Sequence, residues 1–381
     1  MSSFMDLICF SHLRWNFVFQ RPQHLMSRFT NHFRVFFIEE PVFDNKESFI
    51  ESVTADEHVQ IIIPHVNEHL LPADRLLVIR SMLNELVQQH SIEKYIAWFY
   101  TPMAIEWYQF MPPAELIIYD CMDELSLFKN APENLTAHEM TLLQIADLVF
   151  TGGFSLYESK KRFHPAVFPF PSSIDKHHFG KARTITTDPP DQQHLSHPRI
   201  GFFGVIDERF DVSLISEVAL LRPQWQLVIV GPVVKIDPEI LPRANNIHYI
   251  GNRHYNELPA YLAGWDAAMI PFAINDSTRF ISPTKTPEYL AGGVPVVSTP
   301  IKDVVNLYGN TGLVYIADNA TSFVAQIEQA LLIKNNLLWK KAVDNFLSTI
   351  SWDATWEKMM FHINTRLEAK RQHPDKTQLY V

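Results

Sequence analysis

The chain contains the stretch FISPTKTPEYLAGGVPVVST at residues 280–299, in which a loop, a short helix, a glycine stop and an apolar strand follow one another. Ser282 is a residue type that caps helix starts, and Pro283 is tolerated in a first helical turn. Gly292 or Gly293 can adopt the left-handed backbone that ends a helix. The stretch therefore predicts one helix-to-strand step of an α/β fold.

The rest of the chain repeats this rhythm, because short apolar runs alternate with amphipathic stretches from start to finish. Such alternation is typical of β-α units with parallel sheets, so we expect the α/β class. The 381 residues exceed what one hydrophobic core usually holds, which indicates two domains. Strands are predicted at residues 6–11, 34–39, 60–63, 95–100, 116–120, 148–151, 167–170, 199–203, 226–230, 247–250, 267–272, 295–299 and 313–316.

A polar segment separates the two halves of this pattern and is broken by Pro189, Pro190 and Pro198. Polar segments with several prolines and no periodicity are typical of linkers. The predicted division is a first domain at residues 1–171, a linker at 172–198, a second domain at 199–345 and a C-terminal helix at 346–381.

The composition excludes several classes of protein. Hydrophobic residues make up 47% and charged residues 19% of the chain, as in globular proteins. Cys9 and Cys121 are too few for a disulfide framework or a four-ligand zinc site, so we expect two reduced core residues. The net charge of −10 argues against nucleic-acid binding. No apolar run reaches the roughly 18 residues of a membrane span and no secretory signal is evident, so we expect a cytoplasmic protein.

Glycine placement indicates which half of the chain could bind a nucleotide. No glycine precedes Gly152, and the turn after the first strand, SHLRW at residues 11–15, lacks the glycines of a dinucleotide fingerprint or a P-loop. The second half carries Gly204, Gly231 and Gly251 at the ends of predicted strands. A nucleotide is therefore expected in the second domain.

The helix start in residues 280–299 has the groups that a diphosphate requires. Free N–H groups at a helix start attract anions, and Ser282, Thr284 and Lys285 would add two hydroxyls and a cation. Glu288 lies one helical turn later on the same side, where a carboxylate could accept hydrogen bonds from ribose hydroxyls.

Residues 288–297, EYLAGGVPVV, resemble the donor motif of GT-B glycosyltransferases related to family 4, also called group 1. The resemblance implies two doubly wound, Rossmann-like domains facing each other across a cleft, with the C-terminal helix crossing back onto the first domain. It also implies that Glu288 contacts the ribose of the donor. The family commonly has a glutamate near the sugar where this chain has Phe280.

The resemblance extends through the second domain from the strand that precedes Gly204. Arg209 stands near the position of a phosphate-binding arginine, and Arg253 is a candidate for the base pocket. The implied reaction transfers a sugar from a UDP- or GDP-sugar to a hydroxyl, with retention of configuration. We expect no metal and no cofactor, because Lys285, with Ser282 and Thr284, could stabilise the leaving diphosphate.

The acceptor is expected at the segment after the first strand, which combines polar and aromatic residues at a strand's carboxyl end. The candidates are His12, Arg14, Trp15, Arg21, Gln23 and His24. Four arginines against one aspartate make residues 1–38 basic and would suit a glycan, a phosphorylated acceptor or a lipid-linked one at the inner face of a membrane. Alternatively, the aromatic residues pack inward and the arginines are simply solvated.

Asp120, Asp123 and Glu124 gather at the end of the predicted strand 116–120. Carboxylates crowded in this way repel one another, which suggests a purpose for them. Asp123 is the first candidate for the catalytic group and His12 the second, with Lys285 acting on the leaving group. The alternative is that these carboxylates only cap the next helix.

Two other functions fit the same donor motif. A nucleotide-sugar 2-epimerase has the GT-B fold but would not need the aromatic, basic opening segment. A non-catalytic nucleotide-sugar-binding protein would retain the donor site without the chemistry. A glycosyltransferase of surface polysaccharide or glycolipid synthesis is the function we expect.

Overall fold

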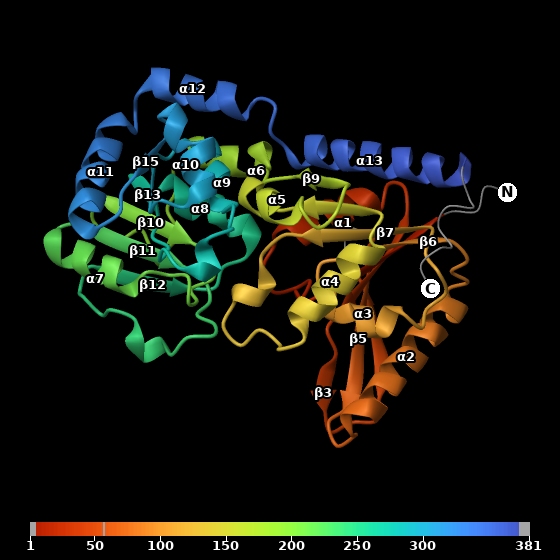
Figure 1. Cartoon of the computed structure of the whole chain (residues 1–381). Coiled ribbons are helices and arrows are strands. Elements are labelled where there is room, and N and C mark those ends of the chain that lie inside the picture. Colours follow the sequence, from red (N-terminus) through yellow and green to blue (C-terminus); the bar gives the residue numbers. More distant parts are fainter. Residues whose placement is uncertain (1–4, 56–57, 373–381) are drawn as a thin grey trace.

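The computed structural model describes residues 5–55 and 58–372. They form two lobes, each a mainly parallel sheet with helices on its faces (Figure 1), so the expected α/β class is confirmed. The strands are β1 Asp6–Ser11, β2 Arg34–Glu39, β3 Val42–Asp44, β4 Phe49–Thr54, β5 Gln60–Asn67, β6 Tyr95–Phe99, β7 Leu116–Cys121, β8 Leu148–Thr151, β9 Val167–Pro169, β10 Arg199–Phe203, β11 Gln226–Val230, β12 Ile247–Gly251, β13 Ala267–Ile270, β14 Val296–Ser298 and β15 Val314–Ile316.

Helices connect most of these strands. The α-helices are α1 Arg21–Phe29, α2 Pro72–Gln89, α3 Ile105–Tyr108, α4 Leu135–Ile145, α5 Phe154–Lys160, α6 Lys176–Gly180, α7 Val212–Leu221, α8 Leu258–Ala263, α9 Lys285–Ala291, α10 Lys302–Leu307, α11 Ala320–Ile333, α12 Leu337–Leu347 and α13 Trp352–Gln372. The short 3₁₀ helices are η1 Pro102–Ala104, η2 Leu125–Leu127, η3 Lys181–Arg183, η4 Pro238–Ile240, η5 Tyr255–Glu257, η6 Asp276–Thr278 and η7 Gly309–Thr311. Among the residues described, no helix is both long and apolar enough to cross a membrane.

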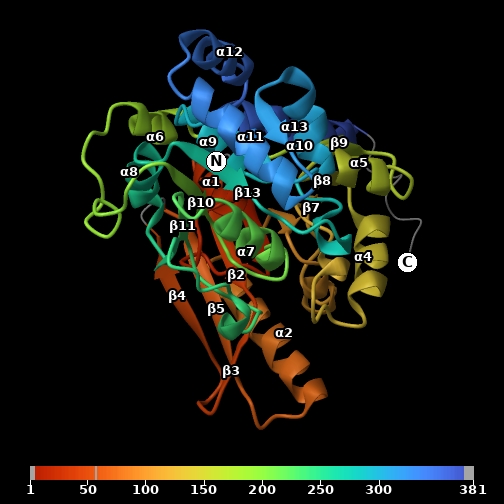
Figure 2. The ribbon, with the colours of Figure 1, turned by 90° about the vertical axis from the view of Figure 1, so that its left-hand side faces the viewer.

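The first sheet has the order β3-β5-β2-β1-β6-β7-β8-β9, with β4 antiparallel to β5. The chain order reverses between β1 and β6, so the loops after these strands lie next to each other at one edge of the sheet. All seven strands predicted here exist, whereas β3 and β4 were not predicted. β3 is three residues long and β4 is largely exposed, so neither shows the buried alternation that identifies a strand. These two strands, with α2, project from the body of the first lobe (Figures 1 and 2).

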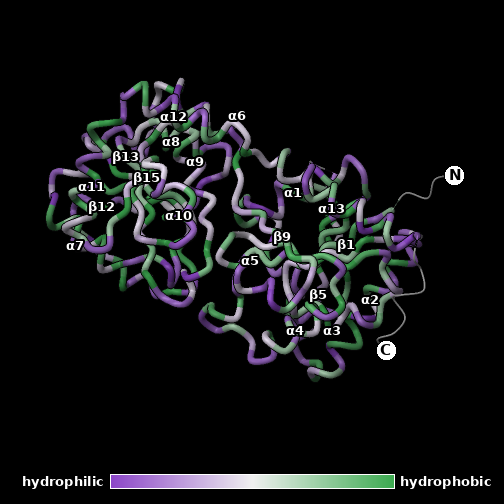
Figure 3. Tube along the Cα trace, turned by 45° about the horizontal axis from the view of Figure 1, so that its top comes forward, coloured by the Kyte–Doolittle hydropathy of each residue, from purple (hydrophilic) through white to green (hydrophobic). Residues whose placement is uncertain are grey.

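The second sheet has the order β12-β11-β10-β13-β14-β15, and all its pairs are parallel. This is the doubly wound order, with the switch between β10 and β13. All six strands predicted here exist. The interior of each lobe is apolar. In Figure 3 the green, hydrophobic parts of the tube lie along the central strands.

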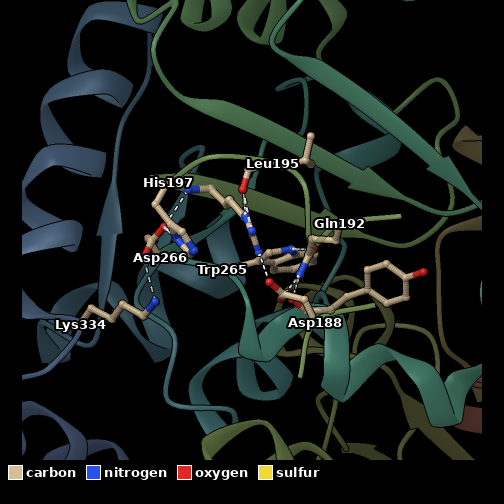
Figure 4. A network of polar contacts seen from close by, with 9 residues as sticks. Asp188, Gln192, Leu195, His197, Trp265, Asp266 and Lys334 are labelled. Atoms are coloured by element: carbon tan, nitrogen blue, oxygen red, sulfur yellow. Dashed lines mark hydrogen bonds and ion pairs between the residues drawn. The ribbon is translucent and has the colours of Figure 1, made fainter. Parts of the chain in front are cut away.

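The proline-containing segment 172–198 includes α6 and is fixed to the second lobe by a network of polar contacts (Figure 4). Asp188 accepts from Arg199 at 2.7 Å, and the side-chain oxygen Oε1 of Gln192 accepts from the Trp265 indole at 2.8 Å. The Asp266 carboxylate contacts two side chains, the His197 ring at 2.6 Å and the Lys334 ammonium at 2.8 Å. A segment without periodicity is therefore ordered by side-chain hydrogen bonds.

The described residues end with α13, which follows α12 of the second lobe and lies along the first lobe (Figure 1). Trp352, Met359 and Ile363 are buried in the same hydrophobic cluster as Leu7 and Trp98 of the first sheet. The residue limits given above for the two domains and the linker remain a prediction.

Candidate functional site

A cleft opens between the lobes, at the carboxyl ends of parallel strands from both sheets. Nine of the residues singled out in the sequence line it, namely Arg21, Asp123, Gly204, Arg209, Arg253, Ser282, Thr284, Lys285 and Glu288. The other five lie outside its lining, namely His12, Arg14, Trp15, Gln23 and His24. The cleft therefore brings the donor candidates together and leaves most acceptor candidates elsewhere.

Helix α9 begins at Lys285, later than the sequence predicts, so the prediction that Ser282 caps it is wrong. The backbone of Thr284 is already helical, and the Ser282 carbonyl instead accepts a hydrogen bond from the Ser172 hydroxyl. At the other end, Gly293 has φ +75° and forms the left-handed stop. Both Ser282 and Thr284 still face the cleft.

Lys285 and Glu288 lie one helical turn apart on the cleft side of α9. Burial, with the nearby Arg209, lowers the pKa of Lys285. Burial raises the pKa of Glu288, and Lys285 opposes that rise. Among the residues described, no carboxylate lies within ion-pair distance of the Lys285 ammonium, which stands 5.4 Å from the centre of the Phe272 ring. The ammonium is thus available to an anion in the cleft.

Two glycines let the backbone approach Lys285 closely. Gly204 has φ +134°, and a β-carbon there would lie 2.2 Å from Cε of Lys285. Gly231 has φ +146°, and its β-carbon would lie 2.0 Å from the carbonyl oxygen of Gly204. Only glycine fits these two strand ends, which form the floor of the cleft.

Arg209 lies beside the cleft but is already bound by a carboxylate. Its guanidinium donates to Asp207 through Nε at 2.9 Å and Nη2 at 2.6 Å. The same guanidinium stands 5.2 Å from the ring centre of Phe128, which belongs to the first lobe. An anionic ligand would therefore share Arg209 with Asp207.

Arg253 stands at the rim of the cleft and is held by hydrogen bonds. Its Nε donates to the Tyr261 hydroxyl at 2.7 Å, and its Nη2 donates to Asp191. Asp191 belongs to the proline-containing segment, so Arg253 ties that segment to the loop after β12. Because Tyr261 and Asp191 already bind it, the Arg253 guanidinium is less available to a ligand in the cleft than an unpaired one.

Asp123 follows β7 and faces the cleft from the first lobe. Burial raises the pKa of Asp123 to about 6, with Arg209 opposing and Asp207 adding to the rise. A carboxyl group with this pKa is ionised at neutral pH and can still take up a proton readily, as a general base must.

His12, the second catalytic candidate, lies outside the lining. Its Nδ1 is buried and has no hydrogen-bond partner among the described residues. Burial lowers the pKa of His12 to about 4, and the nearby charge of Lys235 adds to that effect. His12 is therefore a neutral imidazole at physiological pH.

The arginines of the opening segment are all in ion pairs. The pairs are Arg14 with Glu39 at 2.9 Å, Arg21 with Asp120 at 2.8 Å, Arg28 with Asp353 at 2.7 Å and Arg34 with Asp6 at 2.6 Å. The basic character read from residues 1–38 is thus neutralised by acids elsewhere in the chain. Within the described part of this segment every arginine has an acidic partner, so the structure gives no support to the predicted contact with an anionic membrane, although Arg14 and Arg34 remain 40% and 49% exposed.

The other acceptor candidates serve the packing of the first lobe. Trp15 is buried against Phe37, and the Gln23 amide donates to the Trp15 carbonyl at 2.7 Å. His24 is stacked on Trp352 with ring centres 4.6 Å apart, and burial lowers its pKa. Trp15 thus packs inward as the alternative expects, whereas Phe17 is 41% exposed and the arginines are paired with acids instead of being simply solvated.

Sequence reasoning missed Tyr255, which lines the cleft from the second lobe. Its ring stacks on Phe19 of the first lobe at 4.5 Å and on His178 at 4.1 Å. Nothing in the local sequence indicates contacts between residues so far apart in the chain. Phe280 was noted only as a departure from a motif, and it packs against a core cluster of the first lobe.

Within residues 5–55 and 58–372, no group of three or more His, Cys, Asp or Glu side chains could hold a metal ion. The cleft is instead lined by four cationic side chains, Arg21, Arg209, Arg253 and Lys285, and by the carboxylates Asp123 and Glu288. This arrangement can bind a phosphorylated ligand and transfer a proton.

Comparisons with known proteins agree with the family resemblance and the fold. Residues 197–332, which include most of the second lobe, match the family model described as glycosyl transferases group 1. The chain is also 23% identical over 260 residues to a putative teichuronic acid biosynthesis glycosyltransferase, TuaH, of Bacillus subtilis. That match spans 64% of this chain and 66% of the relative, just under two thirds of its length. The resemblance stated from the sequence is thereby confirmed.

Solved structures show the same fold over nearly the whole chain. The sucrose-phosphate synthase of Thermosynechococcus elongatus superimposes with a TM-score of 0.70 at 12% identity, covering 96% of this chain and 100% of that one. Anabaena HepE in complex with UDP and glucose gives a TM-score of 0.66 at 12% identity, covering 94% and 99%. The protein therefore has the predicted GT-B architecture.

Proposed function

We propose, from the group 1 match of the second lobe and the GT-B fold, that this chain is a glycosyltransferase. It would move a sugar from a nucleoside-diphosphate sugar, with UDP or GDP as the nucleotide, to an acceptor hydroxyl. Polysaccharide synthesis is the proposed setting, since the B. subtilis relative is described as a teichuronic acid glycosyltransferase.

The observation that carries the proposal is the unpaired Lys285 ammonium one helical turn from the buried Glu288, above the glycine floor. Burial disfavours the charged form of Lys285, and a diphosphate beside it would favour that form again. Arg209 would add a second cation. Glu288 would then accept hydrogen bonds from ribose hydroxyls. Charged hydrogen bonds of this kind contribute about 1.5–3 kcal/mol each.

The chemistry follows from where charge develops. As the bond between the anomeric carbon and the diphosphate breaks, negative charge accumulates on the leaving oxygen, and Lys285 would stabilise it without a metal. Asp123 faces the same cleft and would accept the proton of the acceptor hydroxyl or stabilise the sugar cation. Retention of configuration is part of the proposal because the family resemblance implies it.

The donor half is tested by calorimetric titration of UDP and GDP. Lys285→Ala and Glu288→Ala are each expected to weaken binding about 10- to 100-fold, because each removes one charged contact. Lys341→Ala, which removes an exposed lysine on α12, is the matched control and should bind like the wild type. Unchanged affinity in both cleft variants would contradict the proposed donor site.

The reaction is tested by incubating the protein with a panel of UDP- and GDP-sugars, with and without EDTA, in the presence of acceptor extracts. Release of nucleoside diphosphate with sugar transfer, unaffected by EDTA, is the expected result. An isomerised donor without diphosphate release would indicate an epimerase. Binding without either product would indicate a non-catalytic binding protein.

A further inference from the structure

Behind Asp123, on the side away from the cleft, lies a buried charge network that the proposed reaction does not use. The ammonium of Lys160 stands 2.8 Å from Glu124 and 2.7 Å from Glu139. The three side chains are only 4%, 10% and 8% exposed, respectively. Glu139 also accepts a hydrogen bond from the Tyr119 hydroxyl at 2.7 Å. A buried charge without a partner is costly, so each member holds the others in place.

The network pins the turn that carries Asp123. Glu124 directly follows Asp123 and points the opposite way, to Lys160 at the end of α5. The turn begins where the Gly152 N–H donates to the Cys121 carbonyl at 2.8 Å. A β-carbon on Gly152 would lie 2.3 Å from the Met122 carbonyl oxygen, so the backbone is close-packed at this point.

The other end of the same segment contacts the second lobe. The ring of Phe128 lies 5.2 Å from the guanidinium of Arg209 and 5.6 Å from the ammonium of Lys235. The Lys129 N–H donates to Glu208 at 3.2 Å. Residues 122–129 therefore bridge the lobes, and the Glu124–Lys160 pair is the buried ionic anchor of their first-lobe end, beside the apolar packing of Met122.

We propose that Glu124, held by Lys160, is a positioning residue that fixes Asp123 in the cleft. The inference rests on the proposed function only in assigning Asp123 to the reaction centre. Without this anchor, the cross-lobe contacts of Phe128 and Lys129 would draw the segment away from the first lobe. The Asp123 carboxyl group would then no longer be held in the cleft and would be more exposed to water.

The test compares two carboxylates that bind the same ammonium. Glu124→Ala releases the turn, whereas Glu139→Ala removes the partner on α4 and leaves the Glu124–Lys160 pair. In protein labelled with carbon-13 at aspartate carboxyls, the Asp123 signal is assigned by its loss in Asp123→Asn. Its titration, expected near pH 6 in the wild type, should move about one unit lower in Glu124→Ala, because the freed carboxyl is better hydrated.

Glu124→Gln keeps an oxygen for Lys160 and should restore the wild-type titration, while Glu139→Ala should leave it unchanged. Release of UDP or GDP from their sugars should fall at least about tenfold in Glu124→Ala, with unchanged calorimetric affinity for UDP and GDP. An unmoved Asp123 titration in Glu124→Ala, or an equal shift in Glu139→Ala, would overturn the proposal. Should the wild type bind neither nucleotide, the proposed function would fail, and the Asp123 titration would still decide the positioning role.

Discussion

At the scale of single residues, Asp123 shows what the cleft does to a carboxyl group. Its side chain is withdrawn from water, and the opposing effect of Arg209 does not cancel the burial. The folded protein therefore holds a proton on Asp123 more tightly than the unfolded chain does. At neutral pH the ionised Asp123 therefore lowers the stability of the folded protein. Such a cost is common at sites whose chemistry requires a shifted pKa.

This shift predicts a pH-dependent effect of Asp123→Asn on stability. Because the folded-state pKa of about 6 exceeds the ordinary value of 3.8, the wild type loses stability as the pH rises from about 4 through 6. The substitution cannot ionise and should stabilise the protein by about 1–2 kcal/mol at pH 8 and by much less at pH 4.5. Urea unfolding at the two pH values measures the difference.

The matched control is Asp74→Asn, which replaces an exposed aspartate on α2. Its effect on stability should be small and similar at both pH values. Equal stability changes for Asp123→Asn at the two pH values would contradict the raised pKa. The same variant should lose diphosphate release if Asp123 acts in the reaction.

At the scale of elements, the close approach of β10 and β11 shapes the cleft floor. The turn after β11 at Gly231 touches the carbonyl of Gly204, and both glycines have positive φ. Any side chain at Gly231 would push these two strand ends apart. The effect would reach Lys285, which packs over Gly204.

Gly231→Ala is accordingly expected to lower the free energy of unfolding by about 3 kcal/mol, from backbone strain together with the clash. UDP and GDP affinity should fall as well, because the floor beneath Lys285 moves. Gly180→Ala is the control, since Gly180 has helical φ −59° and nothing within 4 Å of its β-carbon position. It should be neutral or slightly stabilising in denaturant titration, and a similar loss in both variants would argue against the predicted strain.

The same elements show how far sequence reasoning reaches. Every strand with a buried apolar run was predicted, because burial on both faces leaves a pattern that needs no tertiary information. That Lys285 and Glu288 face the same side of α9 could be predicted, because they are one helical turn apart in the sequence. Ser282 was wrongly predicted to cap α9. The helix begins only at Lys285, and the Ser282 carbonyl accepts a hydrogen bond from Ser172, a residue 110 positions away that the local sequence does not indicate.

The opening segment was harder to predict for the same reason. Arg21 and Arg28 look like free cations in sequence, yet their carboxylates, Asp120 and Asp353, are 99 and 325 positions away. The ion pairs of Lys160 were not predicted, because its partners Glu124 and Glu139 lie on other elements of the first lobe. Side chains whose partners are distant in sequence carry no local signal, so ion pairing and burial had to come from the structure.

At the scale of the whole molecule, the last helix joins the two lobes. The chain leaves the second lobe after α12, and α13 then packs against α1 and the first sheet. Trp352 begins this helix, is 1% exposed and stacks on His24, and its backbone N–H donates to the Ile174 carbonyl at 3.3 Å. The first lobe is therefore completed by α13, and its stability depends on residues that follow the second lobe.

Trp352→Ala should consequently lower stability by about 3–4 kcal/mol, the usual cost of emptying a buried aromatic site. The loss should fall on the first lobe, so calorimetric unfolding should separate into two transitions, with UDP or GDP raising the second-lobe transition if the proposed donor site is correct. Phe361→Ala, on the same helix and 67% exposed, should leave the unfolding profile within about 0.5 kcal/mol of the wild type. A single transition shifted equally by both substitutions would show that α13 does not hold the first lobe through its buried face.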